Sequence, residues 1–333
     1  MNPYVNIMKL VAALALSSIT VGAVAGESLT YDPDTGIYTM EYYNTYDQPT
    51  PVQQRVQFEL PTRIEPAIKS KIKEKESDKN LLIYRYEIKS GTASKQNIDV
   101  VRIIGTHAYA GNQAVPIGWR GGITPLVSTN EIIAGWSYKV DDLGGLKPGA
   151  TQPGFGFESR DLPGVGIFEF IGNTLRDPGS IQGFPDLGPS SDTPVGKQYS
   201  ELMKNNESVR RFAATPKIRV PDPFDTAVVL AGIQKHIKQD LLSMQLIDPV
   251  FAAQLDGILQ AAIDAAKLNA TKAVRDHLKD LRKLLKKEHA DADKEDDESE
   301  SDPEKIKSGQ VPIDKLAAKV LDFDFKYVEK RLK

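Results

Sequence analysis

The side chains that most often carry catalysis are few and scattered in this chain. The four histidines are His107, His236, His277 and His289. No H-E-x-x-H or H-x-H pattern joins them, the chain has no cysteine to complete a zinc site, and the G-x-S-x-G turn of serine hydrolases is missing. We therefore expect the histidines to be structural or solvated, and the protein not to be an enzyme. A Ser-His-Asp triad assembled across the fold stays an alternative.

Acidic side chains offer a second route to chemistry, because pairs of carboxylates hydrolyse glycosidic bonds. The candidates are Asp141, Asp142, Glu158, Asp161 and Glu169. Carboxylates in the loops of a β-sandwich are mostly solvated surface groups. A secreted glycoside hydrolase or other hydrolase is therefore the third hypothesis for function.

Calcium is the one metal that the sequence suggests. Asp32 and Asp34 stand at alternate positions before Gly36, where two carboxylates could point at one ion, although a simple turn explains the pattern better. A second run begins like an EF-hand at Asp291, but it has Asp296 where that loop needs glycine. We expect no cofactor, with calcium at Asp32 and Asp34 as the alternative.

Two tryptophans are the best indication of a binding surface. Trp119 is flanked by glycines and followed by Arg120, in a stretch typical of a loop, whereas Trp136 lies in a predicted strand. An exposed indole stacks on sugar rings or anchors protein contacts. We therefore predict that Trp119 and Arg120 bind a ligand, with a position of Trp119 over the core as the alternative, and that Trp136 belongs to the core.

The N-terminal residues predict the compartment. Lys9 precedes the apolar run 10–16, and small residues follow up to Ala25. This pattern is typical of a secretory signal peptide, here residues 1–25, and the apolar run is too short for a membrane anchor. We expect an exported bacterial protein that is extracellular, periplasmic or on the cell surface.

Composition narrows the range of partners. The chain has 333 residues, a formal net charge of −3 and 40% hydrophobic residues, which is enough for globular cores. A nearly neutral chain lacks the basic face of a nucleic-acid-binding protein. No later segment resembles a membrane span, and without cysteine neither a lipid anchor nor a disulfide is expected.

Residues 26–172 have the period of β-strands, with short runs rich in tyrosine, valine, isoleucine and phenylalanine between turns. No helical period lies between these runs, so we predict an antiparallel, Ig-like β-sandwich. The lysine- and glutamate-rich stretch 63–80 is expected to be an exposed loop or short helix. The predicted strands contain residues 37–43, 56–60, 82–88, 98–104, 132–138, 155–159 and 166–171.

The remainder divides into a linker and a helical part. Proline and glycine crowd residues 173–224, which predicts a linker with at most one short helix. From residue 225 to 333, apolar residues recur at spacings of three and four, with an acidic loop at 291–304. Asp225, Asp248 before Pro249, and Pro312 are expected to begin helices. The predicted class is α+β multidomain, a sandwich followed by a small helical bundle.

The helical part resembles the FIMAH-type domain of secreted bacterial proteins over residues 241–285 and 306–321. In that pattern one helix ends near an asparagine, and a glycine-containing turn precedes a last helix rich in alanine and leucine. The chain departs from it by the acidic run 291–304 and by Leu281 at an aromatic position. The resemblance implies a non-catalytic accessory or surface role and no particular substrate. The matching residues are Leu255, Leu259, Ala262, Asn269, Ala273, Val274, Leu278, Leu281, Gly309, Leu316 and Ala317.

Together these features favour a non-enzymatic surface or extracellular protein that binds a polymer, such as a polysaccharide, or a partner protein. The alternative is a structural component that forms homo-oligomers through a sheet edge.

Overall fold

A computed structural model describes most of the chain. The described residues are 26–44, 52–106, 111–126, 131–138, 144–173, 192–204, 206–289, 309 and 311–332. The predicted signal peptide, residues 1–25, and the acidic run 291–304 lie outside them. Contacts group the chain into two compact units, Met1–Leu60 with Thr174–Glu207, and Pro61–Asn173 with Ser208–Lys333.

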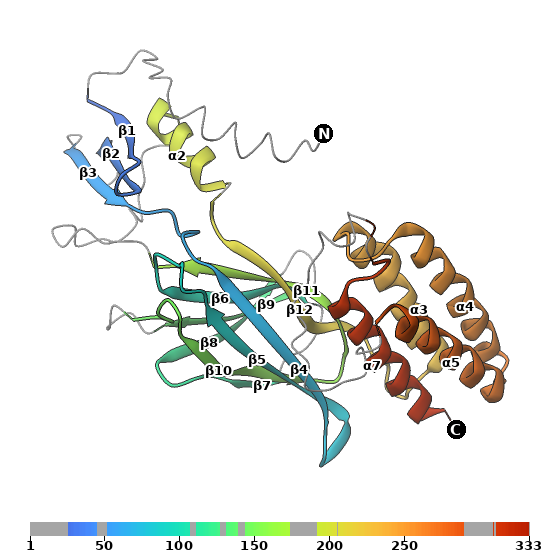
Figure 1. The fold of residues 1–333 in the computed structure, drawn as a ribbon. Coiled ribbons are helices and arrows are strands. Elements are labelled where there is room, and N and C mark those ends of the chain that lie inside the picture. The colour runs from blue at the N-terminus through green and yellow to red at the C-terminus, as the bar shows by residue number, and fades with distance from the viewer. Residues whose placement is uncertain are drawn as a thin grey trace. The chain divides into compact units, whose positions relative to one another are not determined.

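The fold is α+β, with antiparallel sheets and mostly C-terminal helices (Figure 1). The strands are β1 (Ser28–Asp32), β2 (Ile37–Asn44), β3 (Val52–Phe58), β4 (Pro66–Lys75), β5 (Asp78–Ser90), β6 (Ile98–Thr106), β7 (Gly111–Ala114), β8 (Trp119–Leu126), β9 (Glu131–Tyr138), β10 (Thr151–Ser159), β11 (Leu162–Gly172) and β12 (Val209–Ile218). The helices are α2 (Pro194–Lys204), α3 (Thr226–His236), the π-helix η1 (Ile237–Leu241), α4 (Pro249–Lys267), α5 (Thr271–Glu288) and α7 (Lys315–Arg331).

The first unit holds the sheet β1-β2-β3 and helix α2. Alternate side chains of β2 and β3 are buried on one face of the sheet. Among them, Met40 of β2 lies opposite Val56 of β3. Phe58 meets the ring of Tyr199 from α2 edge-on, with ring centroids 5.7 Å apart. A small core of its own therefore holds this unit together.

In the second unit, two antiparallel sheets share one core. Their strand orders are β4-β5-β10-β7 and β12-β11-β6-β9-β8. Tyr86 of β5 lies between them, with its ring centroid 4.8 Å from that of Phe168 in β11 and 6.2 Å from that of Trp136 in β9. The expectation that Trp136 is a core residue is thus confirmed.

The helices of the second unit continue the same core. Helices α3, α4, α5 and α7 pack on one another, and α7 also packs on β11 and β12. Asp225, Asp248 and Asp314 accept hydrogen bonds from the first backbone N–H groups of α3, α4 and α7. The last helix thus begins at Lys315 and not at Pro312 as predicted. Because α7 shares the apolar core of the sheets, the contacts do not divide the chain at the predicted boundaries 172 and 224.

Two further predictions need correction. Residues 63–80 were predicted as a loop or helix, but Pro66–Lys75 form β4 and β5 begins at Asp78. In the predicted linker, residues 173–224, the short helix is present as α2, but Val209–Ile218 form the strand β12. Strand β12 tolerates Pro216 because it is the last strand of its sheet, where a missing backbone N–H breaks no ladder.

One carboxyl group lies inside the apolar core. Asp324 of α7 is 0% exposed, and neither of its oxygens has a hydrogen-bond partner among the described residues. Burial raises the pKa of Asp324 well above its ordinary value, because a charge would be poorly solvated there. Burial therefore favours the neutral, protonated form of Asp324 in the folded protein.

We predict that Asp324→Asn removes a pH-dependent cost of folding. The unfolded carboxyl ionises above about pH 3.9, whereas the folded one keeps its proton. Each pH unit between the two pKa values therefore costs about 1.4 kcal/mol of stability. Urea denaturation should show the variant more stable than the wild type at pH 7, with the two converging near pH 4.

The exposed Asp264 of α4 provides the control, since Asp264→Asn should leave the pH profile as it is. A difference between wild type and Asp324→Asn that stays constant from pH 4 to 8 would contradict the prediction.

Candidate functional site

A groove of about 370 Å³ runs between strand β4 and helix α7. We call it the β4–α7 groove. Ala214 of β12 and residues of the hairpin that joins β4 to β5 complete its lining. The lining residues are Ser70, Lys71, Ile72, Lys73, Glu74, Glu76, Lys79, Ala214, Leu316, Lys319, Val320, Asp322, Phe323, Lys326, Tyr327 and Lys330.

The spacing of residues on α7 explains the chemical character of this wall. Leu316, Val320, Phe323 and Tyr327 recur every three or four residues and so form one apolar stripe. Lysines follow the same stripe at positions 319, 326 and 330. Lysine places its ammonium group at the rim while its methylene chain covers apolar surface. The groove therefore combines an apolar floor with a cationic rim.

Charge in the groove is unbalanced. Six lysines line it, against the acidic residues Glu74, Glu76 and Asp322. Asp322 already pairs with Arg282 at 2.8 Å and with Lys326 at 2.8 Å. These contacts and the pair of Glu74 with Lys330 occupy two of the acids and two of the lysines, and lysine remains in excess by number. An anionic ligand would find an attractive field.

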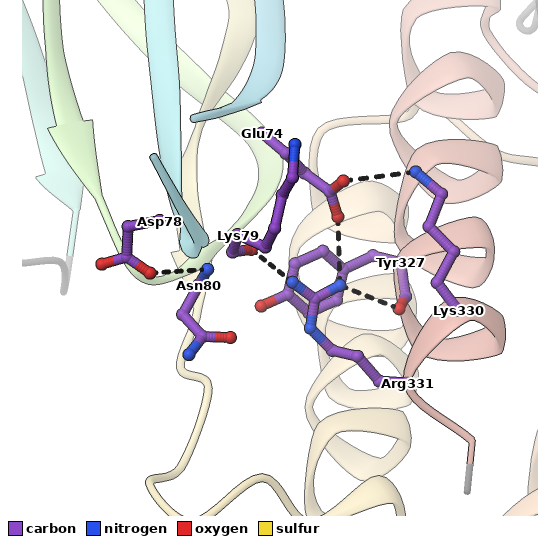
Figure 2. Close-up of polar contacts among 7 residues, drawn as sticks. All are labelled: Glu74, Asp78, Lys79, Asn80, Tyr327, Lys330 and Arg331. Carbon is purple, nitrogen blue, oxygen red and sulfur yellow. Dashed lines mark hydrogen bonds and ion pairs between the residues drawn. The ribbon is translucent and has the colours of Figure 1, made fainter. Parts of the chain in front are cut away.

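Figure 2 shows the polar contacts that join the β4–β5 hairpin to α7 at one end of the groove. Glu74 of β4 pairs with Arg331 at 3.0 Å and with Lys330 at 3.3 Å. The guanidinium of Arg331 also lies over the Tyr327 ring, 3.4 Å from its centroid, and donates to the backbone carbonyl of Lys79. These contacts hold the β4–β5 hairpin against the last turn of α7.

The electrostatics of Glu74 reflect this arrangement. Burial would raise the pKa of its carboxyl, but the hydrogen bond from Arg331 and the charge of Lys330 outweigh burial and lower the pKa. Glu74 therefore stays ionised and stabilises the fold at neutral pH.

The residues that we predicted to bind a ligand are not brought together in one site. Trp119 is 4% exposed, and its ring meets those of Phe155 and Tyr138 edge-on. It belongs to the core, so the loop position expected for it is wrong and no indole face is open for stacking. Its neighbour Arg120 is exposed.

Asp32 and Asp34 lie in the turn that joins β1 to β2. One oxygen of Asp32 accepts the backbone N–H of Asp34 at 2.9 Å, and the other accepts the Thr35 hydroxyl at 2.7 Å. The bond from Thr35 is the main reason that the pKa of Asp32 is lowered. Gly36, with a φ of 74°, completes the turn. Across the described residues, no three histidine or carboxylate side chains gather in a way that could hold a metal.

Two of the side chains considered for catalysis, His236 and Glu169, have structural partners. His236 is buried, accepts the backbone N–H of Val165 at Nε2 and contacts Asp240 through Nδ1 at 2.6 Å. Glu169 pairs with Arg102 and Arg210 on neighbouring strands. Those partners fix both side chains in the fold.

Of the remaining histidines, His289 contacts the Ile313 carbonyl through Nε2 at 2.6 Å, and His277 lies on helix α5. Glu158 pairs with Lys75 at 2.9 Å, and Asp161 accepts from the backbone N–H of Val220 at 3.3 Å. His107, Asp141 and Asp142 lie outside the described residues.

Sequence reasoning missed the lysines of the groove. Those of β4 stood in the stretch expected to be a loop, and those of α7 belong to a helix whose position against the sheet no local pattern reveals. One feature of the sequence could have revealed strand β4. From Lys69 to Lys75, lysine recurs at every second position, which is the period of a β-strand.

Comparison with protein-family models, curated proteins and solved structures finds no match for this chain. The FIMAH-type resemblance therefore stays a prediction. Among the helices in the described ranges, none combines the length and the apolar character needed to cross a bilayer.

We predict that Glu74→Gln loosens the β4–β5 hairpin from α7. A hydrogen bond to a charged group contributes about 1.5–3 kcal/mol, and the variant should lose stability in that range at pH 7. Because the pKa of Glu74 is lowered in the fold, this loss should shrink as the pH falls below about 4. Urea denaturation and hydrogen exchange of residues 66–90 measure both effects.

The control lies on the same hairpin. Glu87 pairs with Lys69 at 3.7 Å in a solvent-exposed position, so Glu87→Gln should cost less than about 1 kcal/mol. Equal losses for the two variants would mean that Glu74 is no more important than a surface charge.

Proposed function

We propose that this is an exported, non-enzymatic binding protein and that the β4–α7 groove holds a negatively charged segment of its partner. The observation that carries the proposal is the excess of lysine over acid around an apolar floor. A groove of about 370 Å³ lies within the range of ligand-binding pockets. Acidic polysaccharides and acidic protein segments both have the chemistry that the rim would recognise.

The sequence supports the remainder of the proposal. The signal-peptide pattern of residues 1–25 favours export from a bacterial cell. An Ig-like sandwich followed by a FIMAH-like bundle would suit an accessory module on a cell surface. On this proposal the two sheets serve as a rigid support for β4, and α7 supplies the second wall of the groove.

The lysines of the groove provide a direct test. Lys73→Glu with Lys79→Glu reverses two charges at the rim, and we expect fluorescein-labelled polyglutamate to bind at least about tenfold more weakly, or about 1.4 kcal/mol. Fluorescence anisotropy at 50 mM and 500 mM salt would measure this, and wild-type binding should weaken with salt.

The matched control is Lys89→Glu with Lys95→Glu, which makes the same change of net charge at exposed lysines outside the groove. Its affinity should stay within about twofold of the wild type. If both double variants lowered the affinity for polyglutamate equally, binding would depend on net charge and the proposed site would be wrong. Failure of the wild type to bind polyglutamate would also overturn the proposed site.

Assembly through a sheet edge is the second candidate. Strand β8 is the last strand of its sheet, and apolar side chains are exposed beside it. Ile117, in the turn between β7 and β8, is 99% exposed, and Val115 and Ile123 are also exposed. Exposed apolar residues beside an unpaired edge favour association with a second copy.

For this candidate we predict a mass that rises with concentration in light scattering of residues 26–333, and a monomer for Ile117→Asp. Leu268→Asp is the control, because Leu268 is also highly exposed but lies at the end of α4. A wild-type monomer at every concentration, with or without calcium, would exclude assembly through β8.

A further inference from the structure

Strand β4 is the last strand of its sheet, and only part of its outer edge is covered. Near its start, Arg211 of β12 donates to the Pro66 carbonyl at 2.8 Å, and the Ala214 N–H donates to the Ser70 hydroxyl at 3.3 Å. From Lys71 onward, no strand among the described residues pairs with this edge. The contacts between β4 and β12 therefore end near Ser70, and the groove begins there.

The groove is lined by the edge of β4 and not by one of its faces. Five consecutive residues, from Ser70 to Glu74, contribute to the lining. Side chains of a strand alternate between two faces, so consecutive residues can share a groove only along the strand edge. Every second residue there directs its backbone N–H and C=O outward, as in any edge strand. The stretch Lys71–Lys75 covers about 17 Å of edge at 3.4 Å per residue.

The side chains of β4 specify what could pair with this edge. Lys71 and Lys73 are exposed on the outer face of the sheet, and Lys71 stands opposite Arg85 of β5, so positive charges adjoin there. Ile72 points the other way and packs against the core. On an added strand, residues beside the lysines would favour acidic side chains, and those beside Ile72 would favour apolar ones.

A second copy of β4 does not fit this edge. Its lysines would face Lys71 and Lys73, and like charges opposite each other destabilise a strand pair. Lysine on an edge strand is a common device against such self-association. The same lysines attract a strand of opposite charge.

We propose that an extended peptide with alternating acidic and apolar residues adds to β4 as an extra strand, with its apolar side chains against Phe323 of α7, which is only partly buried. The inference rests on the proposed function, because it names the partner of the same groove. Backbone hydrogen bonds to β4 supply affinity, and the alternation supplies specificity.

The test uses three fluorescein-labelled peptides of seven residues, each alternating glutamate and valine. One is unmodified, one carries N-methyl groups on the valines and one carries them on the glutamates. In an added strand, only every second residue directs its N–H toward β4. We expect one methylated peptide to lose at least tenfold in affinity and the other to bind within threefold of the unmodified peptide. Hydrogen exchange of residues 70–76 should slow when the unmodified peptide binds.

The possible results separate this inference from the proposed function. Equal binding of the three peptides, or binding of polyglutamate alone, would overturn strand addition while leaving an anion-binding groove. Failure of every anionic probe would overturn both. Lys73→Glu should lower the affinity for the unmodified peptide at least tenfold. Lys89→Glu, on the same face of the sheet but outside the groove, should leave that affinity unchanged.

Discussion

Burial of helix α7 is the constraint on which the second unit depends. The helix contacts β11 and β12 on one side and α3 and α5 on others, and its apolar residues other than Phe323 are buried. A helix that is apolar on several sides needs neighbours on all of them. The two sheets and the other helices provide those neighbours, and the apolar core is therefore continuous from Trp136 to Leu281. The β4–α7 groove lies beside this arrangement and ends where Glu74 of β4 pairs with Lys330 and Arg331 of α7.

Polar groups on α7 divide into two kinds. Asp322 is buried but pairs with Lys326 on the same helix and with Arg282 of α5, and the pair with Arg282 fixes α7 against α5. Asp324, two residues later, has no hydrogen-bond partner within the described part of the chain. A buried ion pair fixes the orientation of a helix more than it stabilises the fold. A buried acid without a partner only lowers the stability of the fold. Helix α7 thus carries Asp322, whose pair with Arg282 orients the helix, close to Asp324, whose burial destabilises the fold. Unfavourable features of this kind occur most often near functional sites.

The sequence predicted those elements whose pattern is local. Alternation identified β5, and Asp248 before Pro249 marked the start of α4, because both signals depend on neighbours in the chain. Strand β4 was missed since its lysines resemble a solvated loop, and β12 was missed since Pro216 resembles a linker. Both are terminal strands, where the usual composition of a strand is relaxed. The groove could not be predicted, because it joins residues near 72 to residues near 323. Trp119 was misjudged because flanking glycines suggest a loop even where the side chain is buried.

The pairing of Glu74 with Arg331 also bears on how the chain is made. These two residues are separated by 257 positions. During synthesis, strands β4 and β5 leave the ribosome long before α7 exists. The end of the hairpin therefore makes its contacts with Lys330 and Arg331 only after the long intervening stretch of chain has been made. Contacts of such long sequence separation slow folding and leave apolar surface open to wrong partners. A segment that covers this surface temporarily, or a chaperone that does so, would benefit this protein more than one whose core closes in the order of synthesis.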